Sequence, residues 1–293
     1  MSDYHFVDIL VNSVLAIIML GVGLSLTIQD FRNILVYPRA IISGLTIQIL
    51  IIPAIAYFIG EISNMSSEQK VGMVLVSTCA SGASSNLITH LVRGNVALAI
   101  SMTTLNSMLT LITLPVIVNL ALLLYMGVDA EITLPVGETI LQIFIVTIAP
   151  ASLGVLIRKL NTKFAMGMEK PLKYILPLIL AFVFVLKIMG SKEQGGSGLT
   201  MDNTLSIFPY VLALNVLAMT VGYFLAKLVR LPFRDQFTIA IEVGLHNTAL
   251  ALLVAGTILK SPDMEKPALV YAMFTFFSAF GFIWAVKGKN MFR

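Results

Sequence analysis

The stretch Val74-Leu75-Val76-Ser77-Thr78-Cys79-Ala80-Ser81-Gly82-Ala83-Ser84-Ser85-Asn86 places a glycine and a cluster of polar side chains inside a long apolar run. A second stretch does the same in the later half of the chain and reads Ile239-Ala240-Ile241-Glu242-Val243-Gly244-Leu245-His246-Asn247-Thr248. Paired interruptions of this kind, one in each half, predict two broken membrane helices that meet near the middle of the bilayer.

The composition supports a membrane location. Hydrophobic residues make up 58% of the 293 residues, charged residues make up 12%, and the mean hydropathy is +0.94. Most of the chain therefore cannot face water, which predicts a polytopic membrane protein with the lipid bilayer as its surroundings. The net charge of +4 comes without a basic run interleaved with aromatic residues, so no nucleic-acid partner is expected.

Nine apolar stretches are long enough to cross about 30 Å of hydrocarbon as helices. They lie near residues 5–26, 38–60, 69–92, 95–124, 135–158, 172–190, 205–228, 236–259 and 267–286. The predicted fold is all-α, with the whole chain, 1–293, forming one transmembrane unit. No basic region precedes the first stretch, so we expect it to remain as a span rather than to be removed as a signal peptide.

The basic residues predict the orientation. With the N-terminus outside, 14 of the 19 Lys and Arg residues fall on the inner side and five on the outer side. This asymmetry favours an outer N-terminus and a cytoplasmic C-terminus in a multi-pass protein of the cell membrane, here a bacterial inner membrane.

The two halves of the chain also have a similar arrangement of polar residues. A span carrying Gln48 precedes the first interruption, and a similar span carrying Asn215 precedes the second. The interrupted spans are the third and the eighth, so they run in opposite directions and any repeat is inverted. This register leaves the fifth span without a partner.

Glu242 is the only carboxylate in the middle of an apolar run. Placing an ionised side chain there costs at least ~2.5 kcal/mol unless a partner compensates it. The partner would be a cation or a proton, and the alternative is a carboxyl group that stays protonated and hydrogen-bonded within the helix bundle.

Polar side chains also follow Gly82, at Ser84, Ser85, Asn86 and Thr89. A helix that restarts there would present free backbone N–H groups, which suit an anionic substrate, while hydroxyl and amide oxygens suit Na⁺. The alternative is that the small residues only let helices approach closely.

His246 lies four residues after Glu242, so the two groups could titrate together, or His246 could be a packing residue. We expect His90 to lie at the membrane interface and His5 at the surface. The single cysteine, Cys79, is expected to be a small buried residue rather than a reactive thiol. Sequence motifs of hydrolases, proteases and nucleotide-binding enzymes are absent, so neither an enzyme, a cofactor nor a transition metal is expected.

The chain resembles the bile acid:sodium symporter family. The matching motifs are CASGASSN (Cys79 to Asn86), VRGN (Val92 to Asn95), EVGLHN (Glu242 to Asn247) and MLGVGLSL (Met19 to Leu26) followed by Asp30-Phe31. The resemblance extends across nearly the whole chain and is specific, because four motifs occur in order with matching spacing. Relative to ten-helix members, the chain lacks the first helix, as nine-helix members do.

The resemblance implies a core domain, with spans near 38–124 and 205–286 including the broken helices 69–92 and 236–259. It also implies a panel domain with spans near 5–26, 135–158 and 172–190. Two sodium sites would lie beside the broken helices, with sodium as a coupling ion rather than a cofactor. The first would use Ser85, Asn86, Thr103 and Glu242, and the second Gln48, Glu242 and backbone oxygens near Val243 and Leu245.

Both implied sites depart from the family pattern, because Ala99 stands where Ser is usual and His246 where Gln is usual. Each departure removes an oxygen ligand, and an imidazole nitrogen suits sodium less well. In the implied substrate cavity Asn247 matches the family, whereas Ala83, Phe274 and Thr275 replace polar family positions. Ser84 and Thr248 complete the set of residues expected to contact substrate.

These observations together predict a secondary active transporter that carries a small organic anion with sodium by alternating access. Proton coupling is the alternative at the same site. An efflux permease of the arsenite type, in which Cys79 would matter, is a second alternative, and an intramembrane enzyme or a sensor is the alternative from another class.

Overall fold

The computed structural model describes residues 6–27, 36–127, 134–190 and 196–288, and within these ranges it is helical, with no strand. The uninterrupted helices are α1 (Phe6–Ser25), α7 (Val96–Met126), α10 (Thr162–Met189), α11 (Met201–Leu228) and α14 (Pro262–Lys287). His5, Asp30 and Phe31 of the sequence analysis lie outside the described residues.

Two further helices each contain a wide π-helical turn. One runs through α3 (Pro38–Thr46), η1 (Ile47–Ile51) and α4 (Ile52–Ile62), and the other through α8 (Val136–Ile143), η2 (Phe144–Ile148) and α9 (Ala149–Leu160). Pro53 and Pro150 follow these turns directly. Proline lacks a backbone N–H and crowds the carbonyl four residues earlier, and a wide turn relieves both effects.

The remaining two helices are the interrupted ones. The first consists of α5 (Ser67–Thr78) and α6 (Ala83–Leu91), and the second of α12 (Phe233–Gly244), α13 (Thr248–Leu252) and η4 (Leu253–Ile258). The predicted stretches agree with the helix bounds to within five residues, except that α10 begins ten residues earlier than expected. Its first turns are polar and therefore fall outside a hydropathy pattern, but Asn161 caps them by accepting from the Phe164 N–H.

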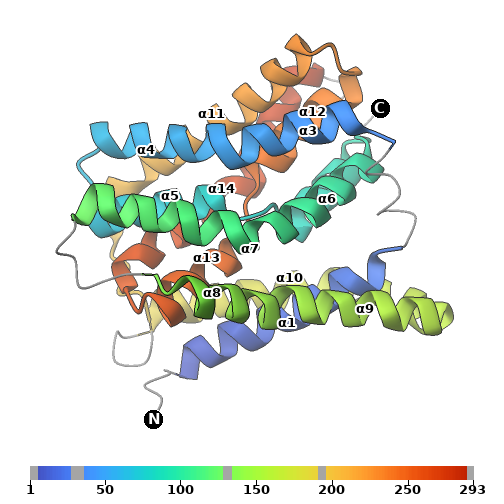
Figure 1. Ribbon diagram of the computed structural model, residues 1–293, viewed down its shortest axis with the longest axis horizontal. Helices are drawn as coiled ribbons and strands as arrows, with labels where there is room; N and C mark the ends of the chain where they lie inside the picture. The colour runs from blue at the N-terminus through green and yellow to red at the C-terminus, as the bar shows by residue number, and fades with distance from the viewer. Residues whose placement is uncertain (1–5, 28–35, 128–133, 191–195, 289–293) are drawn as a thin grey trace.

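The helices lie in layers (Figure 1). α3, α4, α11 and α12 form one outer layer, and α1, α8, α9 and α10 form the opposite one. α5, α6, α7, α13 and α14 lie between these two layers. Within the lower layer α1 packs against both α9 and α10, and it also reaches η4 and α13 in the middle layer.

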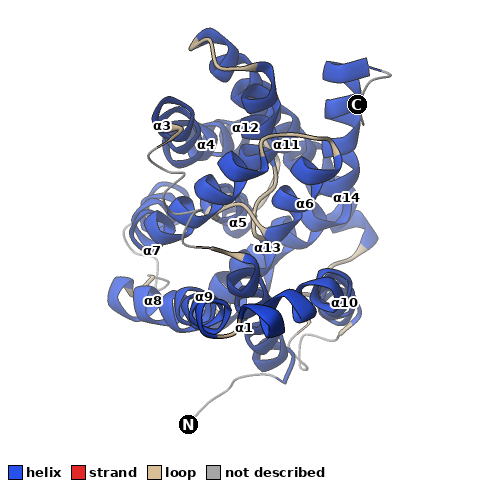
Figure 2. Cartoon of the chain, turned by 90° about the vertical axis from the view of Figure 1, so that its right-hand side faces the viewer, coloured by secondary structure: helices blue, strands red, loops and turns tan. Residues whose placement is uncertain are grey.

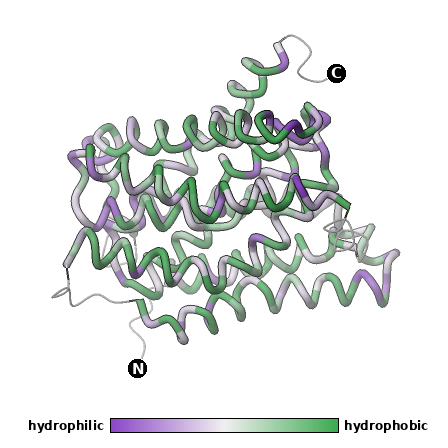
Figure 3. Tube along the Cα trace, turned by 45° about the horizontal axis from the view of Figure 1, so that its top comes forward, coloured by the Kyte–Doolittle hydropathy of each residue, from purple (hydrophilic) through white to green (hydrophobic). Residues whose placement is uncertain are grey.

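Among the described residues, five helical segments are long and apolar enough to cross a membrane: 38–62, 96–126, 136–160, 201–228 and 262–287. These segments carry large exposed apolar side chains such as Phe58 and Phe277, and α10 does so at Leu178. Figure 3 shows hydrophobic residues along the helices and hydrophilic ones gathered mainly at their ends. This distribution is that of a multi-pass membrane protein.

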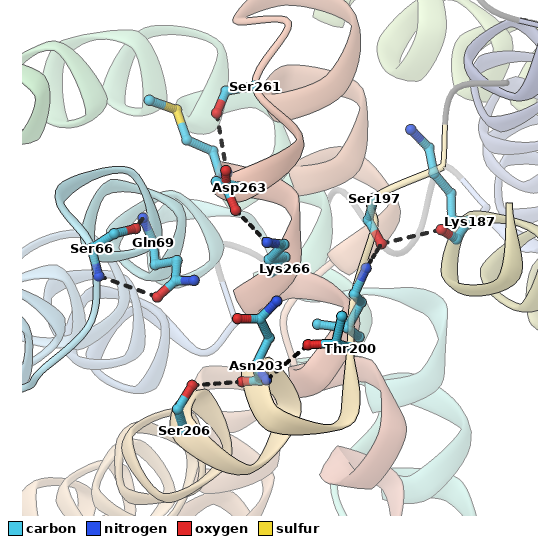
Figure 4. A network of polar contacts seen from close by, with 12 residues as sticks. Ser66, Gln69, Lys187, Ser197, Thr200, Asn203, Ser206, Ser261, Asp263 and Lys266 are labelled. Carbon is cyan, nitrogen blue, oxygen red and sulfur yellow. Dashed lines mark hydrogen bonds and ion pairs between the residues drawn. The ribbon is translucent and has the colours of Figure 1, made fainter. Parts of the chain in front are cut away.

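Polar helix caps lie close together in a network of polar contacts (Figure 4). Ser66 and Gln69 form a capping box at the start of α5, while Thr200 caps α11 and Ser261 caps α14. Such caps satisfy backbone N–H groups that a helix start leaves free. Beside them the Lys187 ammonium on α10 contacts Glu265 on α14 at 2.6 Å, with both side chains buried. The sequence analysis did not predict this pair.

Candidate functional site

Both interruptions fall within the two quoted stretches of sequence. Cys79 to Gly82 separate α5 from α6, with Gly82 as the last residue before α6, and Leu245 to Asn247 separate α12 from α13. Each break leaves a helix C-terminus and a helix N-terminus pointing into the protein interior. Their free carbonyl and N–H groups need partners there, because water and lipid cannot supply them in a buried site.

The two interruptions supply hydrogen-bond partners to each other. The Asn247 N–H donates to the Ala80 carbonyl at 2.8 Å, and Ser81 pairs with His246 as an isolated antiparallel bridge. The labels α5, α6 and α13 lie close together in the interior of the bundle in Figure 2, where most helices are seen end-on. The broken segments are therefore joined through their backbones.

Glu242 lies two residues before Gly244, the last residue of α12, and is 1% exposed. Its Oε2 accepts from the Ser81 hydroxyl at 2.5 Å and from the Thr103 hydroxyl at 2.8 Å. Its Oε1 is buried and has no hydrogen-bond partner among the described residues. The expected partner Thr103 on α7 thus touches the carboxyl, whereas Ser81 was missed because a small serine beside glycine fits close packing equally well.

The residues after Gly82 have distinct environments. Ser85 is fully buried, and its hydroxyl donates to the Gly82 carbonyl at 2.8 Å. The Asn86 Oδ1 is buried and without a hydrogen-bond partner in the part of the chain that the structure describes. Ser84 is exposed at the start of α6, which begins at Ala83.

Gln48 and His246 meet on the other side of the crossing. The Gln48 Nε2 lies 3.2 Å from the Ser77 carbonyl, 3.3 Å from the Cys79 carbonyl and 3.2 Å from the His246 Nδ1. The His246 Nδ1 is also 3.2 Å from the Cys79 carbonyl. The Gln48 Oε1 and the His246 Nε2 are both buried, and neither has a partner among the residues described.

The end of α12 has further partners that the sequence analysis missed. Val243 and Leu245, whose backbone oxygens were expected to matter, are buried on either side of Gly244. The Gly244 carbonyl itself accepts from Asn215 Nδ2 and from the Tyr271 hydroxyl, each at 2.6 Å. Asn215 was noted as part of the repeat, so its polarity in an apolar run was the available signal, whereas Tyr271 gave none.

The expected substrate residues do not all point to one place. Asn247 caps α13, with its Oδ1 accepting from the Leu250 N–H at 3.1 Å, and Thr248 beside it is buried. Thr275 on α14 is partly buried, and its carbonyl oxygen lies 2.9 Å from the Ser278 hydroxyl oxygen. The Phe274 ring packs against Tyr271.

The other singled-out residues have ordinary surroundings. His90 is exposed near the end of α6. Ala99 is fully buried and offers no oxygen from its side chain. Cys79 is fully buried, and its thiol lies 3.3 Å from the Leu75 carbonyl in its own helix. That environment fits a small packing residue.

Several buried polar atoms at and near the crossing have no hydrogen-bond partner among the described residues. They include one carboxylate oxygen and two amide oxygens, on Glu242, Gln48 and Asn86, together with the Thr89 hydroxyl on α6 and the His246 Nε2. Buried polar atoms are normally hydrogen-bonded, so three such oxygens indicate a partner that the protein itself does not supply. Hard cations prefer carboxylate and carbonyl oxygens. No group of three His, Cys, Asp or Glu side chains that could hold a metal ion occurs among the described residues.

A multi-pass helical bundle whose two broken helices meet at a buried carboxylate belongs structurally with the membrane transporters. The comparison with known families agrees. Residues 13–195 match the family model described as the Sodium Bile acid symporter family, and the chain belongs to this family.

Individual relatives are similar over most of the chain. It is 28% identical over 274 residues to Uncharacterized sodium-dependent transporter YocS of Bacillus subtilis, covering 93% of this chain and 81% of the relative. It is 28% identical to Probable sodium/metabolite cotransporter BASS1, chloroplastic, of Oryza sativa subsp. japonica, covering 86% of this chain and 59% of the relative. It is 31% identical to Sodium/bile acid cotransporter 5 of Rattus norvegicus, covering 79% of this chain and 52% of the relative. The chain thus spans little more than half the length of the last two.

Proposed function

We propose that this protein is a secondary active transporter that carries a small organic anion across the membrane together with sodium. The names of the relatives support sodium coupling, since they include a sodium-dependent transporter and sodium/metabolite and sodium/bile acid cotransporters. The observation that carries the proposal is the set of three buried, unpartnered oxygens on Glu242, Gln48 and Asn86 around the two helix breaks.

Two sodium positions are proposed at the crossing. One uses Ser85, Asn86, Thr103 and Glu242, and the contact between Thr103 and Glu242 supports it. A sodium ion here would take the free Glu242 Oε1, compensating the charge that burial otherwise penalises.

The other position uses Gln48, Glu242 and the carbonyls near Val243 and Leu245. The free Gln48 Oε1 supports it, and the His246 nitrogen beside Gln48 makes it the weaker of the two. Protons are the alternative coupling ion at this position.

The proposed anion site lies at the start of α6. The first N–H groups of a helix favour negative charge, and Ser84 is exposed there. Asn247, Thr248, Ala83 and Thr275 are the proposed neighbours, and they leave the class of organic anion open.

The proposed architecture has nine spans. Four segments join the five apolar ones: α1, α10, α5 with α6, and α12 with α13 and η4. They would form inverted repeats, divided into a panel of α1, α8, η2, α9 and α10 and a core of the rest. The equivalent placement of Gln48 and Asn215 at the ends of α5 and α12 supports the repeat. The proposed location is a bacterial inner membrane, with an outer N-terminus and a cytoplasmic C-terminus.

Movement of the core against the panel would expose the site to each side in turn. Each net positive charge that moves inward gains about 2.3 kcal/mol per 100 mV of membrane potential. Symport with more sodium ions than negative charges on the substrate would therefore concentrate an organic acid in the cell.

Purified protein tests the proposal in two stages. Thermal unfolding is measured in sodium chloride and in potassium chloride, alone and with a panel of monocarboxylates, dicarboxylates and sulfonated steroids. We expect sodium to raise the unfolding temperature and one class of anion to raise it further only when sodium is present. That anion should then accumulate in proteoliposomes under an inward sodium gradient. Equal unfolding temperatures in both salts, with no sodium-driven accumulation, would contradict the proposal.

A further inference from the structure

The carbonyl at the C-terminal end of α12 is held by two donors from other helices. Asn215 Nδ2 on α11 and the Tyr271 hydroxyl on α14 each lie 2.6 Å from the Gly244 oxygen. Both side chains are 0% exposed. The last carbonyls of a helix have no partner within the helix, so these donors satisfy a group that would otherwise be buried and unpaired.

The donors belong to a closed set of hydrogen bonds. Asn215 Nδ2 also donates to the Tyr271 oxygen at 3.0 Å, and Asn215 Oδ1 accepts from the Ser278 hydroxyl at 2.6 Å. Both polar atoms of the Asn215 amide are therefore in use. A buried network that is fully satisfied is rigid and specifies one arrangement.

Gln48 provides an instructive comparison. Its Nε2 faces the Ser77 and Cys79 carbonyls at the end of α5, as Asn215 faces the end of α12. Its Oε1, however, is buried and has no partner in the described structure. The amide nitrogens of Gln48 and Asn215 thus both contact carbonyl groups at the end of a broken helix. Only Gln48 has an amide oxygen that remains available for an ion.

Tyr271 acts on both sides of the second interruption. Its hydroxyl holds Gly244, the last residue of α12, while its ring packs against His246 with 5.5 Å between ring centroids. Glu242 lies two residues before Gly244, and Leu245 follows it directly. Fixing Gly244 from α11 and α14 therefore fixes the direction of the backbone that carries the proposed sodium ligands.

α11 can reach this point because it packs very closely on α12. A Cβ built on Gly244 would lie 2.2 Å from the Met219 Cγ, and one on Gly222 would lie 3.2 Å from the Ala240 Cα. Glycine at both positions brings the helices close enough for the short Asn215 side chain to contact the Gly244 carbonyl.

We infer that Asn215, Tyr271 and Ser278 are positioning residues for the sodium-binding step, acting through the Gly244 carbonyl rather than by touching the ion. The inference rests on the proposed sodium coupling. In this inference Asn215, Tyr271 and Ser278 align the backbone at the second break, and Gln48 and Glu242 contact the cation.

Tyr271→Phe tests the inference, because it removes the hydroxyl and keeps the ring against His246. The readout is the sodium concentration that gives half of the sodium-induced rise in unfolding temperature, measured on the purified full chain at constant ionic strength. We expect this concentration to increase about 5- to 10-fold, the effect of losing one well-placed buried hydrogen bond. Tyr223→Phe is the matched control, since the Tyr223 ring packs against Phe224 and Phe282 and its hydroxyl is not among the donors to the Gly244 carbonyl.

A second pair of variants separates positioning from general stability. Ser278→Ala removes the donor to Asn215 Oδ1 and should raise the half-saturating sodium concentration about 2- to 5-fold, whereas Ser278→Thr keeps a hydroxyl and should restore it. A purely structural role would lower the unfolding temperature in sodium and potassium alike and leave the sodium concentration unchanged, which would overturn the inference. If the unaltered protein shows no response to sodium, the proposed function fails and the inference fails with it.

Discussion

The two oxygens of Glu242 have different surroundings. Oε2 accepts from Ser81 and Thr103, while Oε1 is buried and has no partner within the described chain. The sequence was sufficient to single out Glu242, because a lone acid in an apolar run is conspicuous. Ser81 could not be chosen in the same way, since its hydroxyl can donate to Glu242 only when the fold brings the second break beside it.

Glu242→Gln should abolish the response to sodium. Glutamine keeps the size of the side chain but removes the negative charge that would compensate a sodium ion, and the interior offers little solvation in its place. We expect the sodium-induced rise in unfolding temperature and sodium-driven uptake both to disappear. Glu61→Gln, at an exposed position on α4, is the control. A normal sodium response in Glu242→Gln would remove this residue from the coupling mechanism.

His246→Gln should strengthen sodium binding. The imidazole Nδ1 lies 3.2 Å from the Gln48 Nε2, and the Oε1 of the same amide is unpartnered among the described residues, so an amide at position 246 can supply a second hard oxygen ligand. We expect the half-saturating sodium concentration of uptake to fall about 3- to 10-fold, the effect of one added ligand contact. An unchanged sodium dependence would return His246 to the category of packing residues.

At the scale of the elements, most helices could be predicted from hydropathy and turn residues. The breaks at Cys79 to Gly82 and Leu245 to Asn247 follow from glycine and polar residues in apolar runs. The early start of α10 could not be predicted in this way, because its first turns depend on the Asn161 cap rather than on apolar periodicity. The wide turns η1 and η2 were also missed, since proline in an apolar run more simply predicts a kink.

Two glycines let α1 and α9 cross closely. A Cβ on Gly23 would lie 2.0 Å from the Ala151 carbonyl oxygen, and one on Gly154 would lie 2.4 Å from the Leu20 carbonyl oxygen. Both obstacles are backbone atoms, which cannot rotate away as a side chain can. Close contact between small residues is the usual way in which membrane helices associate.

Gly154→Ala should separate α1 from α9 and lower the free energy of unfolding by about 1–3 kcal/mol, the usual cost of overpacking. Gly167→Ala on α10 is the matched control, because a Cβ there meets nothing within 4 Å. Alanine at that position should be neutral or stabilising by up to about 1 kcal/mol. The measurement is chemical denaturation of each variant in the same detergent, and equal midpoints for the two variants would show that the crossing can relax.

At the scale of the whole molecule, one buried ion pair links two layers of the bundle. Lys187 on α10 and Glu265 on α14 contact each other at 2.6 Å, each with about 2% of its side chain exposed. Composition and local pattern could not predict this pair, because the two residues are 78 positions apart. In the sequence each residue is typical of a polar helix end, and only the fold places the two side chains in contact.

Glu265→Gln should destabilise the protein by about 3–5 kcal/mol, because it removes the carboxylate that Lys187 contacts in a buried position. Replacing both residues with methionine should recover most of that loss, since an apolar pair of similar size avoids the desolvation of two charges. The denaturation midpoints of the single and double variants test this, with Lys227→Met at an exposed position as control. A double variant no more stable than Glu265→Gln would show that the charges contribute through other contacts.

The joint between the two broken segments consists of main-chain atoms, with the amide of Asn247 donating to the carbonyl of Ala80. A bond of this kind persists when side chains around it are exchanged, and proline at position 247 is the one replacement that would delete its donor. This one link between the breaks therefore depends on the course of the backbone and not on which side chains occupy positions 80 and 247, proline at position 247 excepted.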